Sequence, residues 1–374
     1  MKCPYCKNED TVTYYKADMP NILSACPESM LKKVKTFSFE AMLCRNCLLG
    51  FNATILPDNE LKMIYDNYLY ISPMRGIGHT KYEGMVNTLK KYYSKDDDLL
   101  EIGCSEGYLL NMLKMEGYLK LTGIEPGPQA DQARELGLNV IKGYFGESTS
   151  SGKTIDGFFM MHVFEHFDNP FLILEAIKKQ LAPRGKIIIE VPNFGGYNHQ
   201  HLFFYSLPFM MRLCREKGLK IIECYNGADI LRIIIVHKDN DQYNEILFSE
   251  KPGDFIGSAK KKYEYFTEVV SKLTRLFKNN INKAVYWWGA GSASVMFMNQ
   301  IDGNALANSN LTVIDGDENK WGMYIPKVNV EVRPYTILEN KSVDVLVIAS
   351  QFHNEIMESL KKRNIHARHI EIIV

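Results

Sequence analysis

The segment DLLEIGCSEGYLLNMLKM, residues 98–115, decides the fold of this chain. It begins with a short apolar strand, turns through Gly103 and Gly107, and continues as a helical pattern from Tyr108 to Met115. A strand, a glycine turn and a helix in this order are typical of the first crossover of a parallel α/β sheet, where a ligand lies against the turn.

The same alternation continues on the C-terminal side of this segment. Strands are expected at 119–125, 139–142, 155–161 and 185–191, and helices around 128–136 and 170–181. Strands that alternate with covering helices predict a doubly wound α/β sheet. A hairpin-like stretch follows at 218–237 and a helix at 258–280. A second α/β pattern then runs from a strand at 283–288 to one at 369–373.

The length of 374 residues exceeds one ordinary domain of about 100–200 residues. We therefore expect three units, with boundaries at 1–75, 76–245 and 246–374. Lys+Arg and Asp+Glu both number 44, so the formal net charge is zero and gives no electrostatic footprint for nucleic acid or an anionic membrane. No apolar run reaches a membrane span, and the first residues do not begin a signal peptide. The expected location is cytoplasmic.

Four of the eight cysteines form two CxxC pairs near the start of the chain, Cys3 with Cys6 and Cys44 with Cys47. In a reducing compartment such pairs indicate metal ligands before disulfides. Four thiolates suit tetrahedral Zn²⁺ and leave no open coordination position, so the predicted zinc site is structural. A nucleic-acid-binding zinc ribbon is the other interpretation, and the neutral charge and the single site argue against it.

The loop after the strand at 98–102 carries an acid, Glu101, before its first glycine. That carboxylate would repel a pyrophosphate and attract a positively charged ligand. Gly103 lets the backbone approach the ligand, and Gly107 allows close packing of helix and strand. Glu125 ends the second strand, where a carboxylate can accept hydrogen bonds from a ribose diol. This pattern looks like a binding site for S-adenosylmethionine, and an ordinary turn with an incidental acid is the alternative.

Two later segments are expected at the same sheet edge. Met161 and His162 end the strand at 155–161, where they would face the cofactor. His162 or His166 could contact a substrate, or one of them could cap the next helix. Past the strand at 185–191, His199 and His201 lie among aromatic residues. A neutral imidazole there could remove a proton near pH 7, or both rings could be packed and hydrogen-bonded.

The second α/β pattern contains its own glycine turn, Gly289-Ala290-Gly291, with Asp315 at the end of the next strand. The turn is similar to a dinucleotide fingerprint but lacks the third glycine. An NAD site and a Rossmann-like unit without a ligand both remain open.

Together these motifs resemble the zinc-containing sugar C-methyltransferases, which methylate nucleotide-linked deoxy-ketosugars. The resemblance covers almost the whole chain: the four cysteines, the loop at 101–125, and in the second α/β pattern the stretches at 289–291, 313–326 and 352–356. It implies a class I methyltransferase Rossmann-like sheet, an N-terminal zinc-binding module and a C-terminal Rossmann-like substrate-binding domain. Implied with them are S-adenosylmethionine and Zn²⁺ as cofactors and a monomer or small homo-oligomer.

The family's catalytic segment typically reads YHEHLSYFS, and residues 198–206 here read NHQHLFFYS. His201 matches the second histidine, which the resemblance implies is the base. Asn198 and Gln200 replace the family's tyrosine and glutamate, and Tyr197 is a substitute for the displaced phenol. The substrate-side tyrosine of the family corresponds to Tyr68 or Tyr70.

The mechanism that this resemblance implies starts with a ketone, which acidifies the neighbouring C–H bond. His201 removes that proton, and the enolate carbon attacks the cofactor's methyl group. An O- or N-methyltransferase that kept the scaffold is the second hypothesis. A zinc-bearing interaction protein with a lapsed cofactor pocket is the third.

Overall fold

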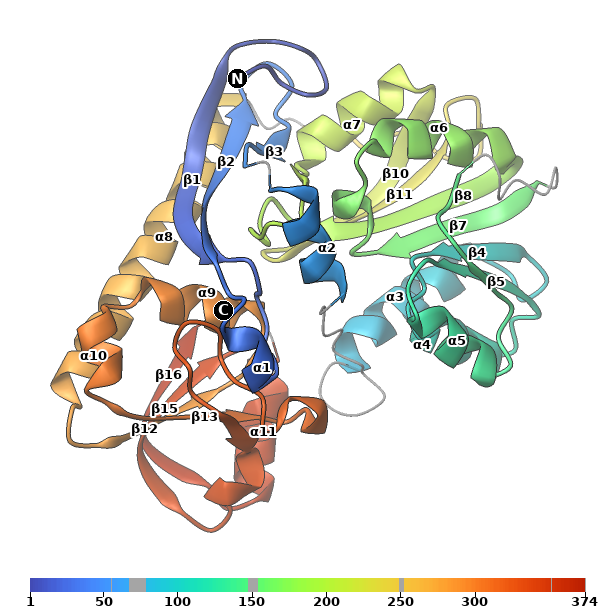
Figure 1. Ribbon diagram of the computed structural model, residues 1–374. Helices are drawn as coiled ribbons and strands as arrows, with labels where there is room; N and C mark the ends of the chain where they lie inside the picture. The colour runs from blue at the N-terminus through green and yellow to red at the C-terminus, as the bar shows by residue number, and fades with distance from the viewer. Residues whose placement is uncertain (55, 67–78, 147–153, 249–251, 351, 374) are drawn as a thin grey trace.

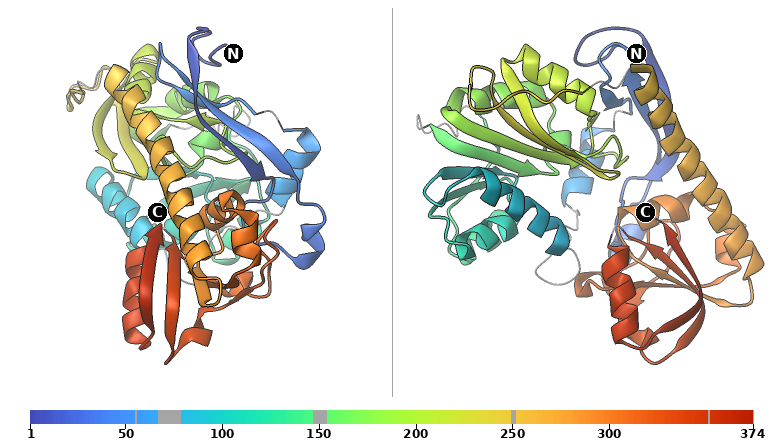
Figure 2. Two further views of the ribbon diagram at one scale, coloured as in Figure 1. Left: turned by 90° about the vertical axis from the view of Figure 1, so that its left-hand side faces the viewer. Right: turned by 180° about the vertical axis from the view of Figure 1, so that it is seen from behind.

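A computed structural model describes residues 1–374 except 55, 67–78, 147–153, 249–251, 351 and 374. The described chain forms three sheets (Figure 1). The N-terminal hairpin stands beside the long helix that precedes the C-terminal sheet, and the largest sheet lies on the other side of the hairpin (Figure 2). None of the described helices has both the length and the apolar character of a membrane span.

The largest sheet has seven strands in the order β10-β11-β8-β7-β4-β5-β6. Its strands are β4 (Asp98–Ile102), β5 (Lys120–Glu125), β6 (Val140–Lys142), β7 (Ile155–Met161), β8 (Leu181–Pro192), β10 (Leu219–Asn226) and β11 (Ile230–His237). β11 pairs antiparallel with both of its neighbours, and the pairings among the other five strands, β8-β7-β4-β5-β6, are parallel. This parallel-rich Rossmann-like sheet confirms the doubly wound fold predicted from the sequence.

Helices cover both faces of this sheet: α3 (His79–Tyr92), α4 (Tyr108–Met115), α5 (Gln129–Glu135), the short 3-10 helix η3 (Phe164–His166), α6 (Pro170–Gln180) and α7 (Leu207–Glu216). All five residues of β4 are buried because apolar layers lie on each side. Leu100 and Ile102 pack in one layer, and Leu99 packs in the other. Burial on both faces therefore holds β4, and the loop that follows it, in the middle of the sheet.

The N-terminal sheet contains β1 (Thr11–Pro20), β2 (Thr36–Cys44), β3 (Gly50–Asn52) and β9 (Phe203–Phe204), with α1 (Glu28–Leu31) and α2 (Asp58–Asp66) in the connections. β9 comes from the middle of the chain and pairs antiparallel with β3. A strand of two residues has no periodicity that a sequence pattern could reveal. The predicted boundary at residues 75 and 76 lies outside the described residues.

The C-terminal unit is a five-stranded parallel sheet in the order β14-β13-β12-β15-β16. Its strands are β12 (Ala284–Trp288), β13 (Asn310–Asp315), β14 (Val332–Pro334), β15 (Ser342–Ala349) and β16 (His366–Ile373). Its helices are α8 (Pro252–Asn279), α9 (Ser292–Gln300), α10 (Gly303–Ala307), η4 (Glu318–Lys320), η5 (Tyr335–Leu338) and α11 (His353–Lys362). This arrangement confirms the second Rossmann-like α/β unit.

The N-terminal module touches both α/β units. It joins the large sheet through β9, and in the other direction Cys26 forms a β-bridge with Tyr324. Tyr15 contacts Tyr263 of α8 edge to face, which adds an aromatic contact to the same side. The module is therefore the structural link between the two Rossmann-like units.

The β3–β9 pairing predicts a stability effect at Gly50. A Cβ atom at this position would lie 2.7 Å from Phe194 and 2.9 Å from the carbonyl oxygen of Phe204. We expect Gly50→Ala to lower the free energy of unfolding by about 1–3 kcal/mol, because the two strands must separate. Thermal and urea unfolding of the full chain measure this change.

Gly257 in α8 provides the matched control, since an added Cβ there meets no atom within 4 Å. Gly257→Ala should leave stability unchanged or raise it by up to about 1 kcal/mol through helix propensity. If the two variants were equally stable, close contact at Gly50 would not be what limits the approach of β3 to β9.

Candidate functional site

The loop after β4 lies where the strand order of the large sheet reverses, since β5 and β7 flank β4 on opposite sides. Gly103 has φ = 74°, and a Cβ atom there would stand 2.4 Å from a methyl carbon of Val163. Gly107 has φ = 77° and precedes α4. Both glycines therefore sit at positions that favour glycine, and the first lets the loop pack against the segment that follows β7.

The two acids predicted to bind the cofactor lie on neighbouring strands of this loop region. Glu125 accepts hydrogen bonds from the backbone N–H groups of Ser105 (3.0 Å) and Gly127 (2.7 Å), which fix its carboxylate beside the loop. Glu101 is buried, and its Oε2 has no hydrogen-bond partner in the described part of the chain. Burial, and then the charge of Glu125, raise the pKa of Glu101 well above its usual value.

These residues fit S-adenosylmethionine. The glycine loop would give backbone access, the fixed carboxylate of Glu125 could accept the ribose hydroxyls, and a polar group of the ligand would supply the partner that the buried oxygen of Glu101 lacks. Met161 and His162, also expected to bind the cofactor, end β7 next to this loop. His162 has φ = 56°, a left-handed conformation that is uncommon for a residue with a side chain.

A second group of polar side chains lies at the ends of β7 and β8. Glu165 is 1% exposed, and its Oε1 lies 3.6 Å from Nδ1 of His162 and 3.8 Å from Nε2 of His201. On the other side, Nε2 of His162 lies 3.3 Å from Oε1 of Glu190, the buried acid near the end of β8. We call these four residues, together with His166, the imidazole–carboxylate cluster.

Two cations lie against the acids of this cluster. Arg232 of β11 donates from Nε to Glu190 at 2.6 Å and also bonds the carbonyl oxygen of Gly84. Burial lowers the pKa of Lys81 on α3, while the negative charges of Glu190 and Glu165 act in the opposite direction. Arg232 therefore offsets the buried charge of Glu190, which would otherwise destabilise the fold.

Burial and neighbouring charges shift the pKa values of Glu165, His201 and His166 in this cluster. Burial opposes ionisation of Glu165, but the adjacent histidines outweigh it and lower the pKa of Glu165 to about 2. Burial, and then His166, lower the pKa of His201 to about 3. Burial also lowers the pKa of His166. At neutral pH the rings therefore offer lone pairs in a site from which water is largely excluded.

The other catalytic candidates lie on the opposite side of the 197–201 segment. His199 is buried against Phe37 and Phe39 of the N-terminal hairpin. Tyr197 stacks on Tyr15 and donates its hydroxyl hydrogen to the carbonyl oxygen of Phe194. Neither ring lies in the cluster, so the structure brings His201, His162 and His166 together and leaves His199 and Tyr197 apart. Tyr68 and Tyr70 fall outside the described residues.

The sequence analysis assigned no role to Glu165, Glu190, Arg232 or Lys81. Two of them carried a readable signal, because Glu190 directly follows the apolar run 187–189 and Arg232 interrupts the apolar run 230–236. Charged residues are seldom fully buried unless they are paired. The pairing of Glu190 with Arg232 follows from the antiparallel contact of β8 and β11, where the two residues are register partners.

The four cysteines of the N-terminal module come together as predicted. Sγ of Cys3 lies 3.6 Å from that of Cys47, and Sγ of Cys6 lies 3.5 Å from that of Cys44. All four sulfurs are within 4.8 Å of one another. With Zn–S bonds of about 2.3 Å, tetrahedral ligands stand roughly 3.8 Å apart, so this set fits a single zinc ion.

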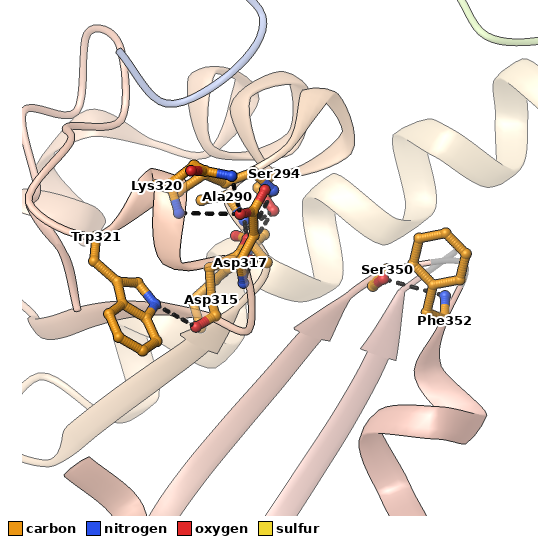
Figure 3. A network of polar contacts seen from close by, with 11 residues as sticks. Ala290, Ser294, Asp315, Asp317, Lys320, Trp321, Ser350 and Phe352 are labelled. Atoms are coloured by element: carbon orange, nitrogen blue, oxygen red, sulfur yellow. Dashed lines mark hydrogen bonds and ion pairs between the residues drawn. The ribbon is translucent and has the colours of Figure 1, made fainter. Parts of the chain in front are cut away.

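The glycine turn of the C-terminal unit is closed by a polar network (Figure 3). The carboxylate of Asp315 accepts from the N–H of Ala290 at 2.7 Å, and Lys320 pairs with the same oxygen at 3.2 Å. Its other oxygen accepts from the N–H of Asp317. A dinucleotide would need this acid for its ribose. Asp315 differs from Glu125 in its ion pair with the buried Lys320, and this pair favours a structural role for the turn.

The geometry of Glu125 predicts the effect of removing it. Glu125→Ala should weaken binding of S-adenosylmethionine by about 2 kcal/mol, roughly 30-fold, because hydrogen bonds to a charged acceptor are lost. Isothermal titration calorimetry measures the affinity. Glu125→Gln, which preserves the side chain's shape, should show most of the loss. Asp131→Ala on exposed α5 is the control, and undiminished affinity in both Glu125 variants would contradict the assignment.

Comparison with known proteins supports the same class. Residues 74–224, less than half of the chain, match the family model described as a methyltransferase domain. No curated protein matches the chain at a significant level. Similar solved structures include an S-adenosylmethionine-dependent methyltransferase from Aquifex aeolicus, with 18% identity over 42% of this chain and 96% of that one and a TM-score of 0.34.

Two further structures cover a similar share of this chain. A methyltransferase from Archaeoglobus fulgidus has 18% identity, covers 41% of this chain and 93% of its own, and has a TM-score of 0.35. Magnesium protoporphyrin IX methyltransferase from Synechocystis, solved with bound S-adenosylmethionine, has 11% identity, coverages of 42% and 78%, and a TM-score of 0.35. The match of residues 74–224 to the methyltransferase domain model, the strand order and the glycine loop agree, and together they support an S-adenosylmethionine-dependent methyltransferase.

Proposed function

We propose that the enzyme methylates a carbon atom of a nucleotide-linked keto-deoxysugar. The observation that carries this proposal is the imidazole–carboxylate cluster, which lies at the same sheet edge as the glycine loop. A carbon nucleophile must lose a proton before it can be methylated, and an imidazole beside a carboxylate can accept one because the carboxylate stabilises the imidazolium that forms. The resemblance of the whole chain to the sugar C-methyltransferases supplies the substrate class.

When bound, S-adenosylmethionine supplies an electrophilic methyl group whose transfer removes the sulfonium charge. The chain's own residues would align the substrate and move its proton. His162 and His201 both face Glu165, so a proton taken by either ring would be stabilised by that carboxylate. Arg232 holds Glu190 in place, and Glu190 lies beside Nε2 of His162. Both nitrogens of the His162 ring therefore face a carboxylate.

A second candidate is O- or N-methylation of another small molecule on the same scaffold. One observation favours it: His199 and Tyr197 are engaged with the N-terminal hairpin, not with the cluster. Residues 197–201 therefore offer fewer polar side chains to a sugar than the resemblance implies. Solvent deuterium separates the two candidates, since only proton removal from carbon exchanges hydrogen beside a carbonyl.

The test uses the full enzyme in D₂O with a nucleotide-linked keto-deoxysugar and S-adenosylhomocysteine. We expect deuterium to enter the carbon next to the carbonyl, detected by NMR or mass spectrometry. His201→Asn should slow this exchange by at least about 100-fold, because it removes one of the two imidazoles that face Glu165 and so disrupts the group that takes the proton. His237→Asn, which alters an imidazole at the far end of β11, should leave it unchanged. If the enzyme methylates this sugar when S-adenosylmethionine is supplied, yet no deuterium enters the carbon with S-adenosylhomocysteine, the proposal is contradicted.

We further propose that the four cysteines hold a structural zinc ion that positions the segment around His201. Leu48, next to Cys47, accepts a hydrogen bond from the hydroxyl of Ser206 at 2.8 Å. Asn52 of β3 donates its amide to the carbonyl oxygen of His201 at 3.3 Å. The metal would thus stabilise the part of the N-terminal module that contacts the segment carrying His201.

Replacing one cysteine tests this zinc site. Cys44→Ser should remove one equivalent of bound Zn²⁺ and abolish thiolate-to-cobalt charge-transfer absorption in the Co²⁺-loaded protein, because a ligand is lost. The variant should also have a lower Tm and lower activity. Cys224→Ser is the control, since this thiol lies outside the cysteine cluster. Unchanged metal content in Cys44→Ser would refute the assignment.

A further inference from the structure

We propose that Glu165, His166 and His201 form a second metal site, which binds a divalent first-row transition-metal ion. One donor atom from each of these residues lies within 4.8 Å of the other two. Metal binding itself does not depend on the proposed function, whereas the catalytic consequence drawn below rests on it. The site differs from the cysteine cluster in its ligand chemistry and in its place at the methyltransferase sheet edge.

The carboxylate of Glu165 is the main observation. Both of its oxygens are buried, and neither has a hydrogen-bond partner among the residues that the structure describes. A buried carboxylate without donors is costly, so a cation or a donor belongs there. Glu190, the neighbouring acid, differs because it is paired with Arg232 at 2.5 Å.

The distance between His201 and Glu165 is too long for a hydrogen bond and is compatible with two ligands of one ion. Nε2 of His201 lies 3.8 Å from Oε1, which exceeds hydrogen-bonding distance. Two ligands of one tetrahedral ion with bonds of about 2.1 Å stand roughly 3.4 Å apart. Small side-chain movements would therefore complete the coordination.

His166 is already oriented as a ligand. Its Nδ1 lies 3.1 Å from the carbonyl oxygen of Gln200. A carbonyl oxygen only accepts hydrogen bonds, so Nδ1 carries the hydrogen and Nε2 keeps its lone pair. Metal-binding histidines typically have this arrangement, in which the other ring nitrogen donates to a backbone carbonyl or a carboxylate. The rings of His166 and His201 meet edge to face, with centroids 4.7 Å apart.

Backbone hydrogen bonds hold the two ligand segments together. The N–H of Leu202 donates to the carbonyl oxygen of Glu165 at 2.9 Å, and the N–H of His201 donates to Oδ1 of Asn198 at 2.9 Å. The three donors are thus fixed by the pairing of residues 164–166 with residues 200–202. A preformed set of this kind needs little ordering when an ion binds.

One carboxylate and two imidazoles suit Zn²⁺, Fe²⁺ or Mn²⁺ and leave coordination positions open for substrate. In the proposed reaction the ion would polarise the ketone oxygen and hold the enolate. The C–H proton would pass to His162, which is 24% exposed and is not one of the three ligands. The electron pair of that C–H bond becomes the enolate, whose carbon would bond the methyl group as the methyl–sulfur bond breaks and the sulfonium leaves as a neutral thioether.

Metal binding is tested with Zn²⁺ alone, without substrate or S-adenosylmethionine. The full chain is treated with a chelator, which is then removed, and titrated with Zn²⁺ by calorimetry, with metal content checked by mass spectrometry. We expect two equivalents for the wild type and one for Cys44→Ser. Glu165→Gln and His201→Gln should each weaken the second equivalent by at least about 100-fold.

Glu175→Gln, which alters a partly exposed carboxylate on α6, is the matched control and should retain two equivalents. Circular dichroism confirms that each variant is folded, and the use of two different ligand variants guards against misfolding of one. A wild type that binds a single Zn²⁺, lost in Cys44→Ser, overturns the proposal. So does full binding in both ligand variants. Since no substrate is present, this result is independent of the deuterium experiment.

Discussion

The pairing of β3 with β9 is the contact on which the arrangement of the site depends. Two short strands from distant parts of the chain share backbone hydrogen bonds and bring Phe51 opposite Phe203. Asn52, at the end of β3, bonds both the carbonyl oxygen of His201 and, through its N–H, that of Leu202. The N-terminal module therefore determines where the segment carrying His201 lies, although that segment follows the large sheet in sequence.

The second constraint is electrostatic. Glu165 and Glu190 are both buried at the strand ends, and the enzyme places Arg232, Lys81 and three imidazoles around them. Burying several charges contributes little to stability and requires close matching of partners. Such a concentration is more common at functional sites than in an ordinary core, which is why the cluster supports a chemical role.

The features predicted correctly from the sequence are those that a short stretch of residues determines. The strand at 98–102, its glycine loop and the acid at Glu125 follow from a short pattern, and the structure places them together at the sheet edge. The contact between Glu165 and His201 could not be predicted, because it joins two loops through tertiary pairing. For the same reason, residue order did not reveal that His199 faces the hairpin while His201 faces Glu165. Asp315 followed the dinucleotide pattern, yet its carboxylate is paired with the buried Lys320.

The bridging position of the N-terminal module has a consequence for dissecting this enzyme. A fragment that began at α3 would contain the entire seven-stranded sheet but would lack the partner of β9, leaving Phe203 and Phe204 on an unprotected edge. The separated C-terminal sheet would likewise lose the cover that Ala25 provides in its core. Neither Rossmann-like unit is therefore expected to be stable as a separate fragment, because each one buries residues against the N-terminal module.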